Sequence, residues 1–123
     1  MKVDYTQYHY QSEFILMRKF FGPIDIHDIT DSWDYLLAHN ILNDKHRGVI
    51  NDIRDAELNM DIHNFQVLLA YLRKNTIFQE IKLAVICDTP GKIIFPMIGN
   101  SLHPELKIKP FSTLEAAAEW ILS

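Results

Sequence analysis

The beginning of the chain has the hydrophobic pattern of a strand hairpin. Residues 3–10 are rich in aromatic side chains and extended in character, and residues 14–21 form a second apolar run. The polar residues 11–13 between the two runs predict a turn, so we expect the runs to pair as antiparallel strands. Gly22 and Pro23 follow the second run and predict its end.

After the hairpin, the pattern alternates between helix and strand. Apolar residues recur at intervals of three and four in residues 26–40 and 62–72, which is typical of helices with one buried face. Residues 48–53 and 106–109 are short apolar runs, and residues 82–87 are almost continuously apolar, as in a strand buried on both faces. Residues 114–122 predict a closing helix, with Ser112 as its N-cap and Glu115 completing a capping box.

Residues 90–102 predict a further, mainly helical segment. Pro90 suits a first helical turn, whereas Pro96 is expected to break or kink a helix. Strands separated by helices favour parallel pairing through right-handed crossovers. The order β-β-α-β-α-β-α-β-α therefore predicts an α/β fold, in which helices pack on a mixed five-stranded sheet.

Composition narrows the possible functions. A chain of 123 residues suits one hydrophobic core, so we expect one domain over residues 1–123. A formal net charge of −4 and scattered Lys and Arg residues give no basic surface for nucleic acid or an anionic membrane. Cys87 is the only cysteine, which excludes an intramolecular disulfide. No apolar run is long enough to span a membrane or to form a signal peptide, so we expect a cytoplasmic protein.

Three segments resemble the SpoIIAA-like proteins, which are stand-alone STAS/SEC14-type domains of bacteria. Residues 48–55, GVINDIRD, are similar to a strand that ends in Asp followed by Ile or Leu in such domains. Residues 82–88, KLAVICD, resemble their apolar central strand, and residues 110–121, PFSTLEAAAEWI, resemble the C-terminal ending of the SpoIIAA-like group. The resemblance spans nearly the whole chain and implies a STAS-type fold.

The resemblance also implies a regulatory module that acts by binding another protein. In SpoIIAA itself, a Ser at the start of the helix after the Asp-containing strand is phosphorylated, and this switches binding. The corresponding segment here is residues 58–63, and no Ser or Thr occurs between Trp33 and Asn75. Because the hydroxyl is missing, the Ser/Thr phospho-switch of the anti-sigma-factor antagonists does not carry over to this chain.

The segment after the predicted strand 48–53 is the candidate interaction rim. Ligands of open α/β sheets bind outside the carboxyl ends of parallel strands, and the resemblance points to the same place. One interpretation of the charges is a catalytic carboxylate pair, and the other is a solvated loop with an internal Arg–Asp pair. The rim consists of Asp52, Arg54, Asp55, Glu57, Asp61 and His63.

Residues 90–102 carry the candidate apolar surface or pocket. A helix that is apolar on nearly every side is either part of the core or covered by a second subunit, a protein partner or an apolar ligand. Pro96 and Gly99 are expected to loosen this helix. The candidate set consists of Ile94, Phe95, Met97, Ile98 and Leu102.

Two possible reactive groups have simpler explanations. Cys87 with His63 as a base is one arrangement for a nucleophile, but a buried free Cys is more often inert packing. The segment from Thr89 to Lys92 suggests a phosphate loop but lacks the spacing of one. A helix start with Thr89 as N-cap explains that segment without a ligand.

A metal site is the less favoured explanation for the repeated Asp-Ile-His segments. Asp25 and Asp61 each precede a predicted helix and are expected to cap it. His27 and Asp31 are one helical turn apart, but a closed metal site usually needs three or four converging ligands.

The sequence as a whole predicts a non-enzymatic binding module with no cofactor and no metal. We expect an unidentified protein partner to contact the rim and residues 90–102. A homodimer through the aromatic hairpin is a further hypothesis, provided that the hairpin lies at the edge of the sheet. The alternative function is a small carrier that holds a lipid or another apolar molecule beneath residues 90–102. A cavity of several hundred Å³ would distinguish such a carrier.

Overall fold

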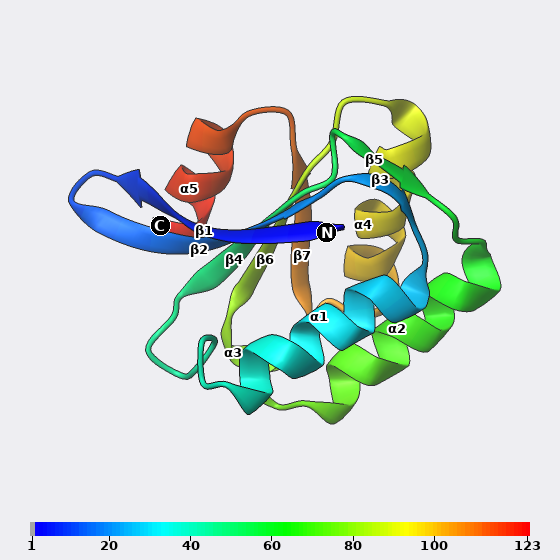
Figure 1. Cartoon of the computed structure of the whole chain (residues 1–123), viewed down its shortest axis with the longest axis horizontal. Helices are drawn as coiled ribbons and strands as arrows, with labels where there is room; N and C mark the ends of the chain where they lie inside the picture. The colour runs from blue at the N-terminus through cyan, green and yellow to red at the C-terminus, as the bar shows by residue number, and fades with distance from the viewer. Residues whose placement is uncertain (1) are drawn as a thin grey trace.

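The computed structural model describes residues 2–123, which form a mixed five-stranded sheet covered by helices (Figure 1). The strand order is β1-β2-β4-β6-β7. β1 (Val3–Tyr10) pairs antiparallel with β2 (Glu13–Phe20). The neighbouring strands β4 (Gly48–Asp52), β6 (Lys82–Ile86) and β7 (Lys107–Phe111) run parallel to β2. The predicted hairpin and mixed five-stranded sheet are therefore confirmed.

The two edges of the sheet differ in character. β1 forms one edge, as the homodimer hypothesis requires, and its turn to β2 consists of Gln11 and Ser12, with φ of 49° and 68°. Two central residues with positive φ are typical of the turn that matches the twist of paired strands. β7 forms the other edge and contains Pro110, which fits an edge because proline has no N–H to donate.

The helices cover the two faces of the sheet unequally. α1 (Ile26–Ala38), α2 (Ile62–Lys74) and α4 (Pro90–Leu102) pack on one face, and α5 (Leu114–Leu122) packs on the other (Figure 1). The larger part of the core lies beneath α1, α2 and α4. α4 continues through Pro96, so the expected break at this proline does not occur.

The helix starts show which sequence signals were decisive. The side chains of Asp25 and Asp61 accept hydrogen bonds from the backbone N–H of the third helical residue, Asp28 in α1 and Asn64 in α2. The side chains of Asp28 and Asn64 in turn accept from the backbone N–H of the two capping residues. These two predicted caps are confirmed. The predicted Ser112 cap is wrong, because β7 extends through Phe111 and leaves Thr113 in the extended conformation before α5. The Thr113 hydroxyl accepts from the backbone of Ala116 at 3.2 Å.

Three short elements were not predicted. β3 (Gly22–Ile24) and β5 (Ala56–Leu58) form a small parallel sheet, and α3 (Ile77–Glu80) precedes β6. Gly22 has φ of 69°, a conformation that favours glycine, and lets the chain turn out of β2 into β3. No helix within residues 2–123 is long and apolar enough to cross a membrane.

Candidate binding pocket and interaction rim

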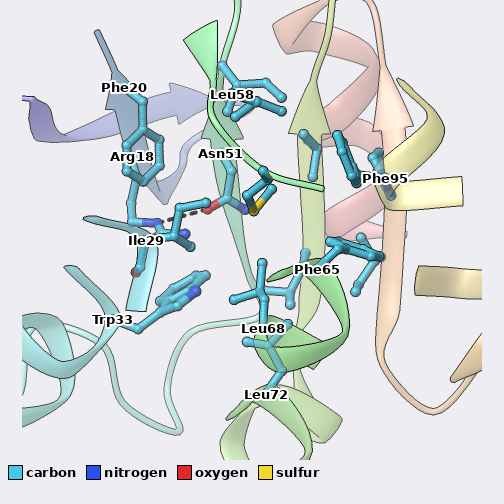
Figure 2. A pocket seen from close by; sticks show the side chains of 16 residues that line it. Arg18, Phe20, Ile29, Trp33, Asn51, Leu58, Phe65, Leu68, Leu72 and Phe95 are labelled. Atoms are coloured by element: carbon cyan, nitrogen blue, oxygen red, sulfur yellow. Dashed lines mark hydrogen bonds between the residues drawn. The ribbon is translucent and has the colours of Figure 1, made fainter. Parts of the chain in front are cut away.

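A pocket of about 90 Å³ lies between the sheet and the helices α1, α2 and α4 (Figure 2). Its floor comes from β2, β4 and β6, and its walls come mainly from the inner faces of α1 and α2. α4 contributes Phe95 and Pro96 to the lining. Of the 16 lining residues, all except Arg18 and Asn51 are apolar.

The pocket opens to solvent at one end. Val85 lies on the interior strand β6, yet its side chain is only half-buried. Leu58, Met60 and Phe95 line the same pocket and are also half-buried. An apolar residue on an interior parallel strand is normally covered on both faces. These four residues therefore mark a mouth that no other part of residues 2–123 closes.

Arg18 and Asn51 form a polar pair within the apolar floor. Arg18 on β2 is in register with Asn51 on β4, which is in register with Val85 on β6. Side chains in register on neighbouring strands point to the same face of a sheet. The next row on this face contains apolar residues: Leu16, Val49, Leu83 and Ile108.

The Arg18 guanidinium is held by contacts with the sheet and with α1. Its Nε donates to Oδ1 of Asn51 at 2.8 Å, as the dashed line in Figure 2 shows. Its Nη1 donates to Oγ of Ser32 at 3.0 Å and to the carbonyl oxygen of Ile29 at 3.2 Å. The guanidinium carbon lies 3.4 Å from the centroid of the Trp33 ring, in the geometry of a cation–π contact.

The charge of Arg18 is not balanced by a carboxylate within residues 2–123. Arg18 is 2% exposed, and none of the ion pairs in this part of the chain includes it. Burial lowers the pKa of Arg18 to about 9, so the group still carries its charge at neutral pH. Its partner Asn51 is neutral and is fixed in orientation, because Nδ2 donates to the carbonyl oxygen of Ala84 at 3.0 Å.

The first half of the interaction rim is joined by ion pairs within the chain. Arg54 donates from Nε to Oδ1 of Asp52 at 3.0 Å and from Nη2 to Oδ2 at 2.8 Å. Burial alone raises the pKa of Asp52, but the hydrogen bonds and charge of Arg54 outweigh it and lower this pKa overall. Asp55 pairs with Lys19 at 3.3 Å, and Lys92 donates to the carbonyl oxygen of Arg54 at 3.0 Å. The rim thus has the internal Arg–Asp pair of the second interpretation above.

The other three rim residues stand apart from this network. Glu57 is exposed on β5, Asp61 caps α2, and His63 is exposed in the first turn of α2. Within the described part of the chain, no hydrogen bond or ion pair joins any of them to Asp52 or Arg54.

The groups considered for chemistry have structural contacts instead. Burial raises the pKa of the Cys87 thiol to about 11, which keeps it protonated at neutral pH, and its sulfur faces the Val85 carbonyl at 3.7 Å. Thr89 is the N-cap of α4, although its side chain makes no capping bond, and the Lys92 ammonium lies 3.2 Å from Asp88. Residues 2–123 contain no group of three or more His, Cys, Asp or Glu that could hold a metal ion.

The candidate apolar set divides between the two sides of α4. Phe95 faces inward and lines the pocket. Ile94, Met97 and Leu102 face outward and are 50%, 58% and 53% exposed, respectively. Ile98 is half-buried and shares a shallow surface depression with Ile94 and Met97. α4 is therefore part core and part surface.

Comparison with known proteins identifies the fold. No family model and no curated protein matches the chain. Among solved structures, it is similar to an uncharacterized protein of the DUF3478 family from Shewanella loihica PV-4, which has a SpoIIAA-like fold. The TM-score is 0.64 at 19% sequence identity, over 97% of this chain and 93% of that protein. The chain has a SpoIIAA-like fold.

Within this SpoIIAA-like fold, residues 58–63, which contain no Ser or Thr, border the pocket. Residues 58–63 extend from the last residue of β5 to the first turn of α2, and two of them, Leu58 and Met60, line the mouth. Sequence reasoning placed candidate sites on the charged rim next to this segment and on residues 90–102, of which Phe95 lines the pocket, and did not select Arg18 or Asn51. The signal for Arg18 was present, because alternation along β2 places it on the same face as Leu16 and Phe20, which are buried.

Proposed function

We propose that the protein binds a small apolar molecule in the pocket between the sheet and the helices α1, α2 and α4. The observation that carries this proposal is the incompletely buried Val85 on an interior strand, at the mouth of an apolar pocket. Sites for small molecules are concave, mostly apolar, and contain a few polar groups that fix the orientation of the ligand. The pocket has this composition, with Arg18 and Asn51 as its polar groups.

The size of the pocket limits the ligand. Its volume of about 90 Å³ is smaller than the several hundred Å³ expected for a lipid carrier. A cavity of about 150 Å³ in another protein holds one benzene molecule, so by proportion this pocket holds an apolar body of about four carbon atoms. The proposal is therefore a binder of small molecules rather than of whole lipids.

Titration with n-pentanol, followed by the amide NMR signals of the isotope-labelled protein, tests this function. Signals from the pocket, such as those of Val85 and Phe95, should shift and then saturate as the alcohol is added. Val85→Phe places a larger side chain in the mouth and should abolish these shifts. Val67→Phe makes the same chemical change on the exposed face of α2 and should leave them unchanged. Saturable shifts that persist in Val85→Phe, or their absence in the unaltered protein, would refute the proposal.

The protein-docking function predicted from the sequence is a second candidate. The exposed Ile94, Met97 and Leu102 on the outer side of α4 favour it, because clustered large apolar side chains on a surface are typical of contact sites. Affinity capture from the cells of origin should then retain a protein that is lost when Ile94 and Met97 are changed to Ser. Val67→Ser is the matched control on α2. Identical sets of captured proteins from all three baits would contradict docking by α4.

A further inference from the structure

We propose that the pocket selects small apolar carboxylates and that Arg18 binds the carboxylate group of the ligand. This inference rests on the proposed function and names the ligand class of the same pocket. It is carried by one juxtaposition, which is a buried arginine without an anionic partner at an apolar pocket that opens to solvent.

The unbalanced charge is the first step of the argument. A charge removed from water is costly unless an opposite charge or enough hydrogen bonds compensate it. Among the described residues, Arg18 donates only to neutral acceptors, namely Asn51, Ser32 and a backbone carbonyl. The remaining lining side chains of the pocket are apolar. An anion that enters the pocket would supply the charge that residues 2–123 do not.

The free donors of Arg18 are the second step. A guanidinium has five N–H donors in a planar fork. Nε and Nη1 are bonded to partners within the chain, whereas no hydrogen bond from Nη2 occurs among residues 2–123. No side-chain nitrogen or oxygen in this part of the chain is both sealed from water and without a partner, so Nη2 borders space that a water molecule can reach. Two N–H groups are therefore available to a carboxylate oxygen.

The surroundings hold these donors in one orientation. The Trp33 ring covers one face of the guanidinium, and Asn51 and Ser32 fix its edge. A donor that is already in position loses little conformational freedom when it binds, which strengthens a charge-assisted hydrogen bond. Arg18 is thus arranged for an acceptor before any ligand is present.

The pocket disfavours other classes of ligand. A cationic ligand would be repelled by the guanidinium, and the pocket lining contains no carboxylate to receive it. A phosphate would leave several of its oxygens against apolar walls without donors, which is costly. A monocarboxylate with a short hydrocarbon chain satisfies Nη2 with its oxygens and the apolar walls with its chain. Pentanoate has the appropriate size, with about four carbons beyond the carboxylate carbon.

A comparison of three ligands of equal chain length tests the inference. Pentanoate, n-pentanol and n-pentylamine are titrated separately into the unaltered protein at neutral pH, and the dissociation constants are taken from the amide shifts of Asn51 and Val85. We expect pentanoate to bind at least about ten-fold more tightly than pentanol, as a charge-assisted hydrogen bond predicts, and pentylamine to bind most weakly.

Variants of Arg18 test the assignment of the anchor. Arg18→Gln should weaken pentanoate binding by about ten-fold or more and change pentanol binding by less than about three-fold. Arg73→Gln removes the same charge from the exposed face of α2 and should change neither affinity. The ligand comparison uses the unaltered protein, so it remains decisive even when Arg18→Gln does not fold.

The outcomes separate this inference from the proposed function. Equal affinities for pentanoate and pentanol would overturn the carboxylate inference and leave the apolar pocket in place. Preference for pentanoate that is undiminished in folded Arg18→Gln would overturn the role of Arg18. If neither pentanoate nor pentanol shifts the pocket signals, the proposed function and the inference both fail.

Discussion

Removal of the buried charge at Arg18 should stabilise the protein in the absence of ligand. The perturbation is the double substitution Arg18→Met with Asn51→Leu, which replaces the polar pair on the sheet by apolar side chains of similar length. Met keeps an unbranched chain over Trp33, and Leu removes the carbonyl that would otherwise lose its partner. The two single variants complete a double-mutant cycle.

The magnitude follows from the environment of the guanidinium. A fall in the pKa of Arg18 from its usual value to about 9 corresponds to a penalty on the charged form on the order of 5 kcal/mol. Loss of the cation–π contact with Trp33 offsets about 1–2 kcal/mol of the gain, and the lost hydrogen bonds offset about another 1–2 kcal/mol. We therefore expect the double variant to be more stable than the unaltered protein by about 1–3 kcal/mol, as for other buried ionic groups replaced by apolar ones.

The single variants should behave asymmetrically. Asn51→Leu leaves Nε of the charged Arg18 without an acceptor and should destabilise the fold by about 2–3 kcal/mol. Arg18→Met leaves the neutral Oδ1 of Asn51 unpaired, but it also removes the buried charge, so its net effect should be within about 1 kcal/mol of zero. Asn51→Leu is thus the least stable of the four proteins, and the double variant is the most stable.

Urea denaturation at pH 7, followed by circular dichroism, measures these differences. The denaturant dependence of the unfolding free energy should be the same for all four proteins, which shows that the substitutions change stability and not the extent of unfolding. A double variant that is less stable than the unaltered protein would refute the reasoning. It would mean that the hydrogen bonds of Arg18 already compensate its burial, so that the guanidinium does not need an anionic ligand.

Three further predictions follow from the same structure. Burial lowers the folded-state pKa of Arg18 below its unfolded value, so the free-energy cost of burying its charge is present below about pH 9 and declines above it. The stability of the unaltered protein relative to Arg18→Met should therefore rise from about pH 9 to 12, by up to about 1.4 kcal/mol per pH unit. Urea denaturation measures this rise. The folded-state pKa of Asp52 is lowered by Arg54, so Asp52→Asn should cost about 1–3 kcal/mol at pH 7 and less as the pH falls below about 4, and a pH-independent cost would contradict this. Gly48→Ala should lower stability by about 3 kcal/mol or more in thermal unfolding, because its Cβ would lie 2.6 Å from a backbone oxygen of β6. The matched change Gly91→Ala meets open space in α4 and should be neutral or slightly stabilising.

The parts of the fold that were predictable have long, repeated signals. The alternation of helix and strand after residue 25 extends over whole elements, and each repeat of the hydrophobic period supports the same assignment. β3 and β5 have three residues each and α3 has four, which is too short for either period to be recognised. Their pairing depends instead on contacts between distant parts of the chain, such as Gly22 with Ala56.

Local signals also failed where two assignments compete for one residue. Ser112 and Thr113 are both good N-caps, and the spacing to Glu115 favoured Ser112. The length of β7 decides which of the two residues caps α5. Phe111 still pairs with Ile86 of β6, so Ser112 lies in the bend between β7 and α5. Pro96 likewise carries a strong local signal for a break, but α4 continues through it, and this residue is buried against the pocket.

The site was only partly predictable, because the sequence shows where charges are but not which are balanced. In the rim, Arg54 is matched by Asp52 two residues away, and a sequence shows such local pairs readily. For Arg18, the neighbouring Lys19 is also basic, so the two residues together look like an ordinary exposed pair. Lys19 does pair with Asp55, whereas Arg18 points to the opposite face of β2, toward α1.

The contrast between the two arginines is the reason to place function inside the fold rather than on the rim. Arg54 and Asp52 neutralise each other, and together with Lys92 they connect the loop after β4 to the start of α4. Because the two charges balance each other and hold the loop in place, this ion pair has a structural role that requires no ligand. Arg18 is more deeply buried and has neutral partners, and burial disfavours its charged form in the ligand-free protein. Natural proteins retain destabilising groups mainly where binding or catalysis needs them, so the unbalanced charge is better evidence of a binding site than the larger number of charges on the surface.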